Sequence, residues 1–364
     1  MTAASLSRHA PRSGEELAAK LRDSAAEAGA AGVSERTYNL AAEPVRLRFA
    51  GPALERLMAP ALAHLEQPSG RATLTIDVWE SAAGARRPDV ALMTAAGAAD
   101  ENHLDAPGAS YHYRDPFIEA LYQPAPDILA ALDAEGTHGW FWTGDSSRLP
   151  YWDRAAPFRH VVSWWLSRRN VLQLHGGAVG MPEGGVLLVG RGGSGKSTAA
   201  LSSLVEPRLL YAGDDYVAVA TEPKPWVHSL YRSAKVDADN LARVPHVEPL
   251  VTNPTRLRTE KAVVEIGGEY RDRLTQGFPL AAIVLAKITP EGPRIVPTSG
   301  AAALTALAPS TILQRRPPRP ADLAAVRRLT EKVPAFVLES GPDPAAIPSV
   351  LVALLEDVIR EQNR

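Results

Sequence analysis

The chain has 364 residues, 39 basic and 41 acidic side chains, a formal net charge of -2, and 45% hydrophobic residues. This is the composition of a folded globular protein, and it excludes a fibrous or wholly disordered chain. The near-neutral charge predicts no general attraction to nucleic acid or to an anionic membrane. The length is sufficient for two domains.

Three further absences narrow the class of protein to which the chain can belong. The chain contains no cysteine, which excludes disulfides, thiolate chemistry and thiol-ligated zinc. Residues 1–35 are rich in alanine but carry several charges, so they lack the apolar core of a signal peptide. Strongly apolar segments such as Leu280 to Ala286 are far too short to span a bilayer. We therefore expect a cytoplasmic protein with neither a membrane nor a nucleic acid as partner.

The N-terminal part predicts a mobile tail followed by a small domain. Residues 1–35 are expected to be a flexible tail that holds one helix, Gly14 to Ala28, with Ser13 as its N-cap. Alternating apolar residues then predict a strand around Leu47 and another around Ile76, with helical spacing from Pro52 to Leu65 between them. This order of elements predicts an α+β domain over residues 36–155.

Many short strand-like pieces follow between residues 86 and 154, together with a group of aromatic residues. The aromatic positions are Tyr111, Tyr113, Trp140, Phe141, Trp142, Tyr151 and Trp152. Aromatic residues interleaved with basic ones can stack on single-stranded nucleic acid. Here basic residues are sparse and Asp115, Asp133 and Asp145 intervene, so the pattern favours core or interface packing.

Residues 156–364 predict a second, α/β domain. After a helical segment from Ala156 to Asn170, short apolar strands alternate with glycines, which is typical of a nucleotide-binding sheet. The expected strands are 171–179, 185–189, 208–212, 216–220 and 281–288. The C-terminal quarter predicts helices at 301–307, 321–333 and 347–362, with an extended basic loop at 315–320.

A complete GxxxxGK[ST] phosphate-loop motif lies between one of these strands and a helix-prone segment. Its residues are Gly190, Arg191, Gly192, Gly193, Ser194, Gly195, Lys196 and Ser197, and Thr198 follows. Glycines let successive backbone N–H groups face a phosphate without obstruction by Cβ atoms. The motif predicts binding of ATP with Mg²⁺, with Lys196 on the β- and γ-phosphates and Ser197 on the metal.

Two further signals lie near this motif in sequence. Asp214 and Asp215 follow an apolar strand, at the sheet edge where ligands bind in α/β folds. Either carboxylate suits Mg²⁺ or the proton of an attacking hydroxyl. His175 precedes two glycines on an earlier strand, where a phosphate has room to approach.

The order of these motifs resembles the catalytic domain of HPr kinase/phosphorylase. The similarity covers about residues 170–290 and uses His175-Gly176, the phosphate loop, and Asp214-Asp215-Tyr216-Val217. It implies a P-loop kinase fold, with Asp214 as the base that deprotonates an acceptor hydroxyl and His175 orienting it. It also implies an arginine that stabilises the transferred charge, for which Arg273 is the candidate, and a possible homo-oligomer.

One motif of that family has no counterpart here. Its Glu-x-Arg-Gly segment supplies a metal-binding glutamate and supports phosphorolysis, whereas this chain has Val227 to Lys235 at the corresponding distance. The second metal ligand is then Asp214 or Asp215, and Lys235 or Arg232 is left to contact substrate or phosphate, or to be solvated. The departure favours a one-way kinase similar to the HPr-kinase-related proteins of bacterial biosynthetic gene clusters.

Three functions remain open from the sequence. The first is a Mg²⁺/ATP-dependent kinase that phosphorylates a Ser or Thr hydroxyl of a peptide or small protein. The second keeps the same site but phosphorylates a small-molecule alcohol, such as a sugar or a natural-product intermediate. The third is a nucleotide-binding switch without transfer activity.

Overall fold

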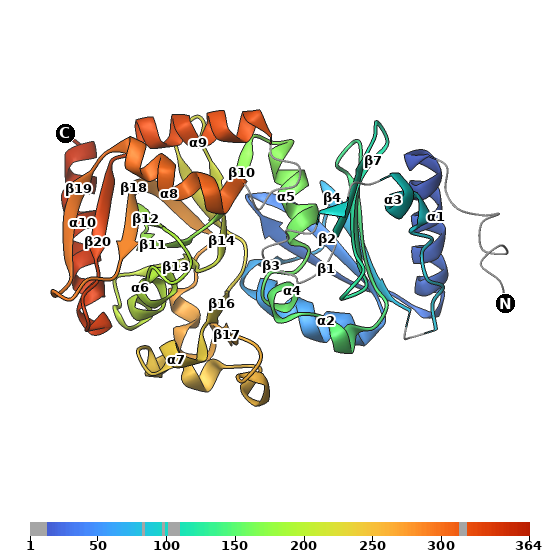
Figure 1. Cartoon of the computed structure of the whole chain (residues 1–364), viewed down its shortest axis with the longest axis horizontal. Helices are drawn as coiled ribbons and strands as arrows, with labels where there is room; N and C mark the ends of the chain where they lie inside the picture. The colour runs from blue at the N-terminus through green and yellow to red at the C-terminus, as the bar shows by residue number, and fades with distance from the viewer. Residues whose placement is uncertain (1–12, 82–83, 97–98, 101–109, 313–318) are drawn as a thin grey trace. The chain divides into compact units, whose positions relative to one another are not determined.

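The computed structural model describes residues 13–81, 84–96, 99–100, 110–312 and 319–364 of the chain. These residues form two compact units of mixed α/β structure (Figure 1). The first unit takes in Met1–Asn39, Glu43–Pro60 and Glu66–Arg168, and the second takes in Leu40–Ala42, Ala61–Leu65 and Arg169–Arg364. None of the described helices is both long and apolar enough to cross a membrane.

The first unit is built on a sheet that contains nine strands over the described residues, in the order β3-β1-β2-β4-β9-β8-β7-β6-β5. Its strands are β1 Ser34–Leu40, β2 Glu43–Ala50, β3 Glu66–Gln67, β4 Leu74–Glu80, β5 Ala99–Asp100, β6 Ser110–Arg114, β7 Ile118–Gln123, β8 Ile128–Asp133 and β9 His138–Thr143. The two strands predicted from alternation are β2 and β4, whose apolar positions are buried. Strands β2, β4 and β9 run parallel to one another, so the unit is mixed rather than antiparallel.

Helix α1 (Gly14–Ala28) packs on this sheet instead of belonging to a mobile tail. The predicted helix is confirmed, and Ser13 caps it by accepting a hydrogen bond from the Glu16 N–H at 3.3 Å. Leu17 and Leu21 are buried in the core that contains Trp79, so the apolar face of the helix fixes the segment in place. Residues 1–12 of the expected tail lie outside the described residues.

Of the seven aromatic residues singled out in the sequence, three are buried, namely Trp140, Phe141 and Trp142, and four are half-buried, namely Tyr111, Tyr113, Tyr151 and Trp152. Trp140 and Trp142 are fully buried on β9. The remaining helices of the unit are α2 Pro52–Met58, α3 Ala91–Ala96, α4 Tyr151–Ala155 and α5 Arg159–Ser167. Helix α5 packs on the sheet of the first unit, where a Cβ on Gly139 would come within 2.8 Å of Val161. The division of the chain at residue 155 remains a prediction.

The second unit is built around the strand that precedes the phosphate loop. Its strands are β10 Val171–His175, β11 Gly177–Met181, β12 Gly184–Val189, β13 Leu210–Gly213, β14 Tyr216–Ala220, β15 Trp226–Ser229, β16 Ser233–Val236, β17 Ala262–Glu265, β18 Gly277–Lys287, β19 Arg294–Thr298 and β20 Ala335–Glu339. The main sheet runs β10-β14-β15-β18-β12-β11-β13, with β20 on β18 and β19 on β20. Every residue of β12 is buried, which explains its continuous apolar sequence.

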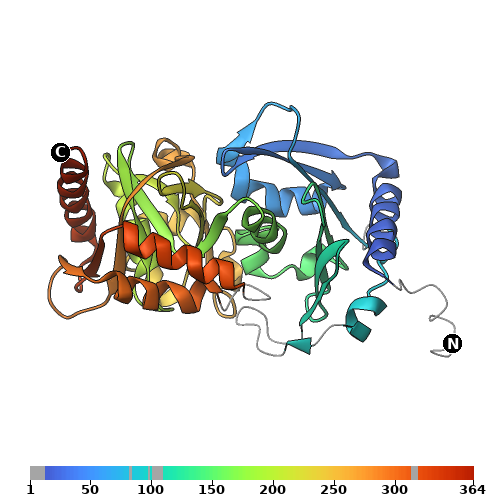
Figure 2. The ribbon, with the colours of Figure 1, turned by 90° about the horizontal axis from the view of Figure 1, so that it is seen from above.

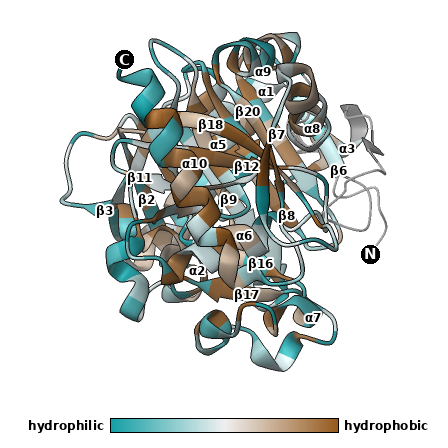
Figure 3. Cartoon of the chain, turned by 90° about the vertical axis from the view of Figure 1, so that its left-hand side faces the viewer, coloured by the Kyte–Doolittle hydropathy of each residue, from teal (hydrophilic) through white to brown (hydrophobic). Residues whose placement is uncertain are grey.

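Helices cover both faces of this sheet (Figures 1 and 2). They are α6 Lys196–Ser202, α8 Gly300–Ile312, α9 Pro320–Lys332 and α10 Ile347–Gln362, whereas the short helix α7 Ala238–Leu241 lies near β16 and β17. Val186 and Leu188 of β12 share a core with α6 and α10, whereas Leu187 and Val189 share one with the adjacent pair α8 and α9. Figure 3 shows β12 and β18 as largely hydrophobic, as burial between two helical layers requires. The predicted basic loop lies mostly outside the described residues.

Strand directions bring several loops to one edge of the sheet. Strand β12 is parallel to β18, which is parallel to β20. Strand β11 is antiparallel to both β12 and β13, so β13 runs in the same direction as β12. The four strands β12, β13, β18 and β20 therefore end at the same edge. The phosphate loop follows β12 at that edge.

We predict that Gly185→Ala destabilises the second unit. A Cβ at this position of β12 would lie 2.1 Å from Phe278, a fully buried ring on β18. Overpacking of this kind costs about 1–3 kcal/mol. Urea denaturation should show the loss for Gly185→Ala and not for Gly192→Ala, where an added Cβ has no neighbour within 4 Å. Equal stability of Gly185→Ala and the wild type would contradict the described packing of β12.

Candidate functional site

The phosphate loop adopts a shape that only glycine accommodates without strain. Gly190, Gly193 and Gly195 have φ values of 140°, 75° and 100°, which are unfavourable for residues with a side chain. An added Cβ on Gly192 or Gly193 would meet no atom within 4 Å, so open space lies against the backbone there. The loop is therefore preformed with a clear approach to its peptide groups.

The lysine of the motif lies inside the loop. The Lys196 ammonium donates hydrogen bonds to the carbonyl oxygens of Gly190 at 2.8 Å and Arg191 at 3.0 Å. Burial lowers the pKa of Lys196, and the charges of Asp214 and Asp215 partly oppose that shift. The structure thus places the lysine within electrostatic reach of both aspartates, although 18 residues separate it from the first of them.

Asp214 follows β13 and is almost completely buried, with 2% of its surface exposed. Its Oδ2 accepts a hydrogen bond from the backbone N–H of Lys235 on β16 at 3.2 Å. Its Oδ1 is buried and has no well-formed hydrogen bond among the described residues. The Ser197 hydroxyl of the phosphate loop interacts with the same carboxyl group. Asp214 is therefore the carboxylate with one oxygen still available beside the loop.

Asp215 is held by two side chains, His175 and Lys235. Its Oδ1 lies 3.2 Å from Nε2 of His175, and its Oδ2 lies 2.8 Å from the Lys235 ammonium. The Tyr216 ring stacks on His175 at 5.4 Å between centroids and faces the Lys235 ammonium at 5.7 Å. His175, Asp215, Lys235 and Tyr216 form one ordered group at the end of β10 and the start of β14.

The two adjacent carboxyl groups have opposite pKa shifts. Burial raises the pKa of Asp214 to about 6, and the neighbouring charge of Asp215 adds to the increase. Burial also opposes ionisation of Asp215, but Lys235 and His175 outweigh it and hold the pKa of that carboxyl well below its ordinary value. Asp215 is thus a fixed anion, whereas Asp214 exchanges its proton near neutral pH.

The residues at the phosphate loop fit a nucleoside triphosphate with Mg²⁺. Mg²⁺ commonly takes one or two protein oxygens together with phosphates and water. The Ser197 hydroxyl offers such an oxygen, whereas both oxygens of Asp215 already have partners, His175 on Oδ1 and Lys235 on Oδ2. No cluster of three or more metal-binding side chains occurs among the described residues, so an all-protein metal cage is not seen there.

The structure does not bring Arg273 to this group. Its guanidinium donates to the carbonyl oxygen of Pro207 at 2.7 Å, before β13 begins and thus at the other end of that strand from Asp214. From the sequence we expect Lys235 and Arg232 either to contact substrate or phosphate or to be solvated. Lys235 is instead part of the aspartate group, and Arg232 pairs with Glu265 at 3.4 Å. The local sequence around Lys235 holds no motif that identifies this contact.

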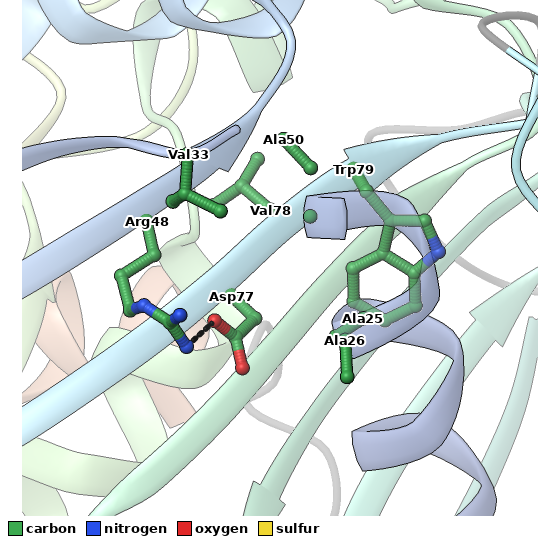
Figure 4. Close-up of a pocket in the computed structure, with 9 residues that line it drawn as sticks. Ala25, Ala26, Val33, Arg48, Ala50, Asp77, Val78 and Trp79 are labelled. Carbon is green, nitrogen blue, oxygen red and sulfur yellow. Dashed lines mark hydrogen bonds and ion pairs between the residues drawn. The ribbon is translucent and has the colours of Figure 1, made fainter. Parts of the chain in front are cut away.

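A separate small cavity lies in the first unit (Figure 4). It has a volume of about 210 Å³ and is lined by Ala25, Ala26, Gly29, Val33, Arg48, Ala50, Asp77, Val78 and Trp79. The charged residues in it already satisfy each other, because Arg48 contacts Asp77 at 2.8 Å and Asp77 also binds His138 at 2.8 Å. The cavity therefore offers no counterpart to the open glycine backbone of the phosphate loop or to the available carboxylate oxygen of Asp214.

Comparisons with known proteins identify no family. No protein-family model matches the chain, and no curated protein matches it. Among solved structures, the Hpr(Ser) kinase/phosphatase from Coxiella burnetii aligns with 52% of this chain and 95% of its own length, at 11% identity and a TM-score of 0.27. A TM-score this low does not establish a common fold. The case for a function rests on the geometry of the site.

We predict that Asp214→Asn stabilises the protein at alkaline pH. Because burial raises the pKa of Asp214 from its ordinary value of 3.8 to about 6, the folded state binds one more proton than the unfolded state between these pH values. Stability from this group is therefore present at low pH and lost as pH rises through 6. A pKa difference of about two corresponds to a free energy of about 3 kcal/mol. The free energy of unfolding of the variant should therefore exceed that of the wild type by up to that amount at pH 8.

Thermal and urea unfolding at pH 4 and pH 8 will check this expectation. The advantage of Asp214→Asn should be large at pH 8 and small at pH 4. The exposed Asp272→Asn variant should show no such pH dependence. A destabilised Asp214→Asn protein at pH 8 would show that the charged carboxylate is favoured by its surroundings.

Proposed function

We propose that the second unit is a Mg²⁺/ATP-dependent kinase that transfers the γ-phosphoryl group to a hydroxyl, in the manner of HPr kinase. The observation that carries the proposal is the position of Asp214. Its buried carboxyl group, with one available oxygen, contacts both the phosphate-loop residue Ser197 and the β16 residue Lys235. A glycine-rich loop alone supports nucleotide binding, and this carboxylate adds a base for transfer.

The residues take separate roles in this reaction. Lys196 neutralises charge on the β- and γ-phosphates, and loop N–H groups hold the phosphate oxygens. Ser197 would hold Mg²⁺, which when bound neutralises developing charge and aligns the phosphates. Asp215 is held ionised by His175 and Lys235, so it serves as a fixed charge that orients these two side chains rather than as the base.

Asp214 is the proposed general base. A base works best when its pKa is near the working pH, and the pKa of Asp214 is about 6. Its Oδ1 takes the proton of the acceptor hydroxyl while the hydroxyl oxygen bonds to the γ-phosphorus. The bond from that phosphorus to the β–γ bridging oxygen breaks, and ADP leaves with that oxygen. The products are the phosphate monoester, ADP and the proton on Asp214.

The proposed acceptor is a Ser or Thr of a peptide or small protein, and the proposed direction is forward only. HPr kinase/phosphorylase has a metal-binding glutamate where this chain has the segment from Val227 to Lys235. Lys235 contacts both aspartates, through its backbone N–H on Asp214 and its ammonium on Asp215. A small-molecule alcohol would use the same base and the same loop. A cytoplasmic location fits the use of ATP.

We predict that Lys196→Ala and Asp214→Asn fail in different ways. Lys196→Ala should weaken ATP binding and reduce transfer by at least about 100-fold, because it removes a cation from the transferred phosphoryl group. Asp214→Asn should keep ATP binding within about threefold and reduce transfer by about 100- to 10,000-fold. Titration calorimetry measures binding, and transfer of labelled γ-phosphate to peptide and alcohol libraries measures activity.

Arg273→Ala is the matched control for these variants. Its side chain is tied to Pro207 O away from Asp214, so both binding and transfer should stay within about twofold of wild type. Wild-type transfer by Asp214→Asn would exclude Asp214 as the base. Tight ATP binding by the wild type, with no transfer to any acceptor and no hydrolysis, would instead indicate a nucleotide-binding switch.

A further inference from the structure

The phosphate loop lies between two different groups of strand ends. On one side are β11 and β13, which lead to the group formed by His175, Asp214 and Asp215. On the other side are β18 and its neighbour β20, which also end at this edge. A triphosphate is a linear group, and its γ end belongs next to the carboxylates. The rest of the nucleotide must therefore leave the loop in another direction.

An exposed apolar side chain stands on that other side. Ile288 follows β18 directly, and half of its surface, 50%, is exposed to solvent. It is also adjacent to the loop, because a Cβ on Gly195 would lie 3.5 Å from its Cγ1 and 3.8 Å from the Ser340 hydroxyl. A large aliphatic side chain exposed beside a glycine-rich loop offers a flat apolar group a surface on which to pack.

We propose that the heterocyclic base of the bound nucleotide packs on Ile288, between the loop after β18 and the loop after β20. This inference rests on the proposed function for the location of the phosphates, and it adds where the nucleoside is held. The occupant is the base, because it is the apolar, planar part of a nucleotide and it must lie away from the γ-phosphate. Ribose and phosphates are too polar to favour this contact.

The two loops form a firm support for such a contact. The Ser340 N–H donates to the carbonyl oxygen of Lys287 at 2.9 Å, which ties the loop after β20 to the end of β18. Gly341 has a φ of +65°, and a Cβ there would lie 2.7 Å from the carbonyl oxygen of Glu291, so the loops approach closely. A preformed surface of this kind binds without the cost of ordering a loop.

Nearby charges do not compete for the apolar surface. Glu339, the last residue of β20, is paired with Lys287 at 3.6 Å and with Arg294 at 2.5 Å. Both cationic side chains are therefore bound to the Glu339 carboxylate at the end of β20. Ile288 is left as the apolar feature of this edge that adjoins the phosphate loop.

The test compares ATP with inorganic tripolyphosphate, which carries the same phosphates and no base. Titration calorimetry with Mg²⁺ measures both ligands on the full chain. Ile288→Ala should raise the dissociation constant for ATP roughly five- to twentyfold, from the apolar contact removed. The dissociation constant for tripolyphosphate should change by less than about twofold, because its contacts lie in the loop.

Two further variants complete the test. Ile288→Leu keeps an aliphatic surface and should retain wild-type affinity for ATP within about threefold. Val205→Ala removes an aliphatic side chain of similar exposure, 51%, which follows the C-terminal end of α6, opposite to the end at the phosphate loop. This variant should bind both ligands with wild-type affinity. Photolabelling with 8-azido-ATP should mark residues of the two loops, as located by mass spectrometry.

The outcomes separate this inference from the proposed function. If Ile288→Ala binds ATP as wild type does, or weakens ATP and tripolyphosphate equally, the base does not pack on Ile288 and the inference is overturned. If wild-type protein binds tripolyphosphate and ATP equally well, there is no base subsite. If wild-type protein binds neither ligand, the proposed function itself fails.

Discussion

Two neighbouring carboxyl groups at the end of β13, Asp214 buried and Asp215 half-buried, impose the main constraint on the second unit. Burying one charge is costly, and burying two side by side is more so unless each has its own partners. Lys235 meets this need twice, with its ammonium on Asp215 and its backbone N–H on Asp214. The site therefore requires β16 to lie against β13, and it requires His175 at the end of β10.

The same constraint divides the chemistry between the two aspartates. Asp215, bound by Lys235 and His175, stays an anion because these partners lower its pKa, while Asp214 has an available oxygen and a raised pKa. A protein that needed only to bind phosphate would gain stability by neutralising Asp214. Keeping a buried carboxyl group with a raised pKa in the interior is the kind of local cost that functional sites carry.

The sheet decides which groups meet at the phosphate loop. Strand β12 is buried between two layers of helices, α6 and α10 on one face and α8 and α9 on the other. The position of its C-terminal end, where the phosphate loop begins, is therefore set by this packing. Strand directions then place Asp214 on one side of the loop and Ile288 on the other. The proposed kinase site and the proposed base subsite are consequences of that one arrangement.

Features that depend on local pattern could be predicted from the sequence. The phosphate loop, its strand, the alternating strands β2 and β4, and helix α1 with its Ser13 cap all follow from neighbours in the chain. Contacts between side chains that are distant in the sequence could be read only from the fold. In the fold Lys235 contacts the aspartates, Arg273 lies away from them, and α1 packs against the sheet. These arrangements depend on strand order and burial, which short-range spacing in the sequence does not encode.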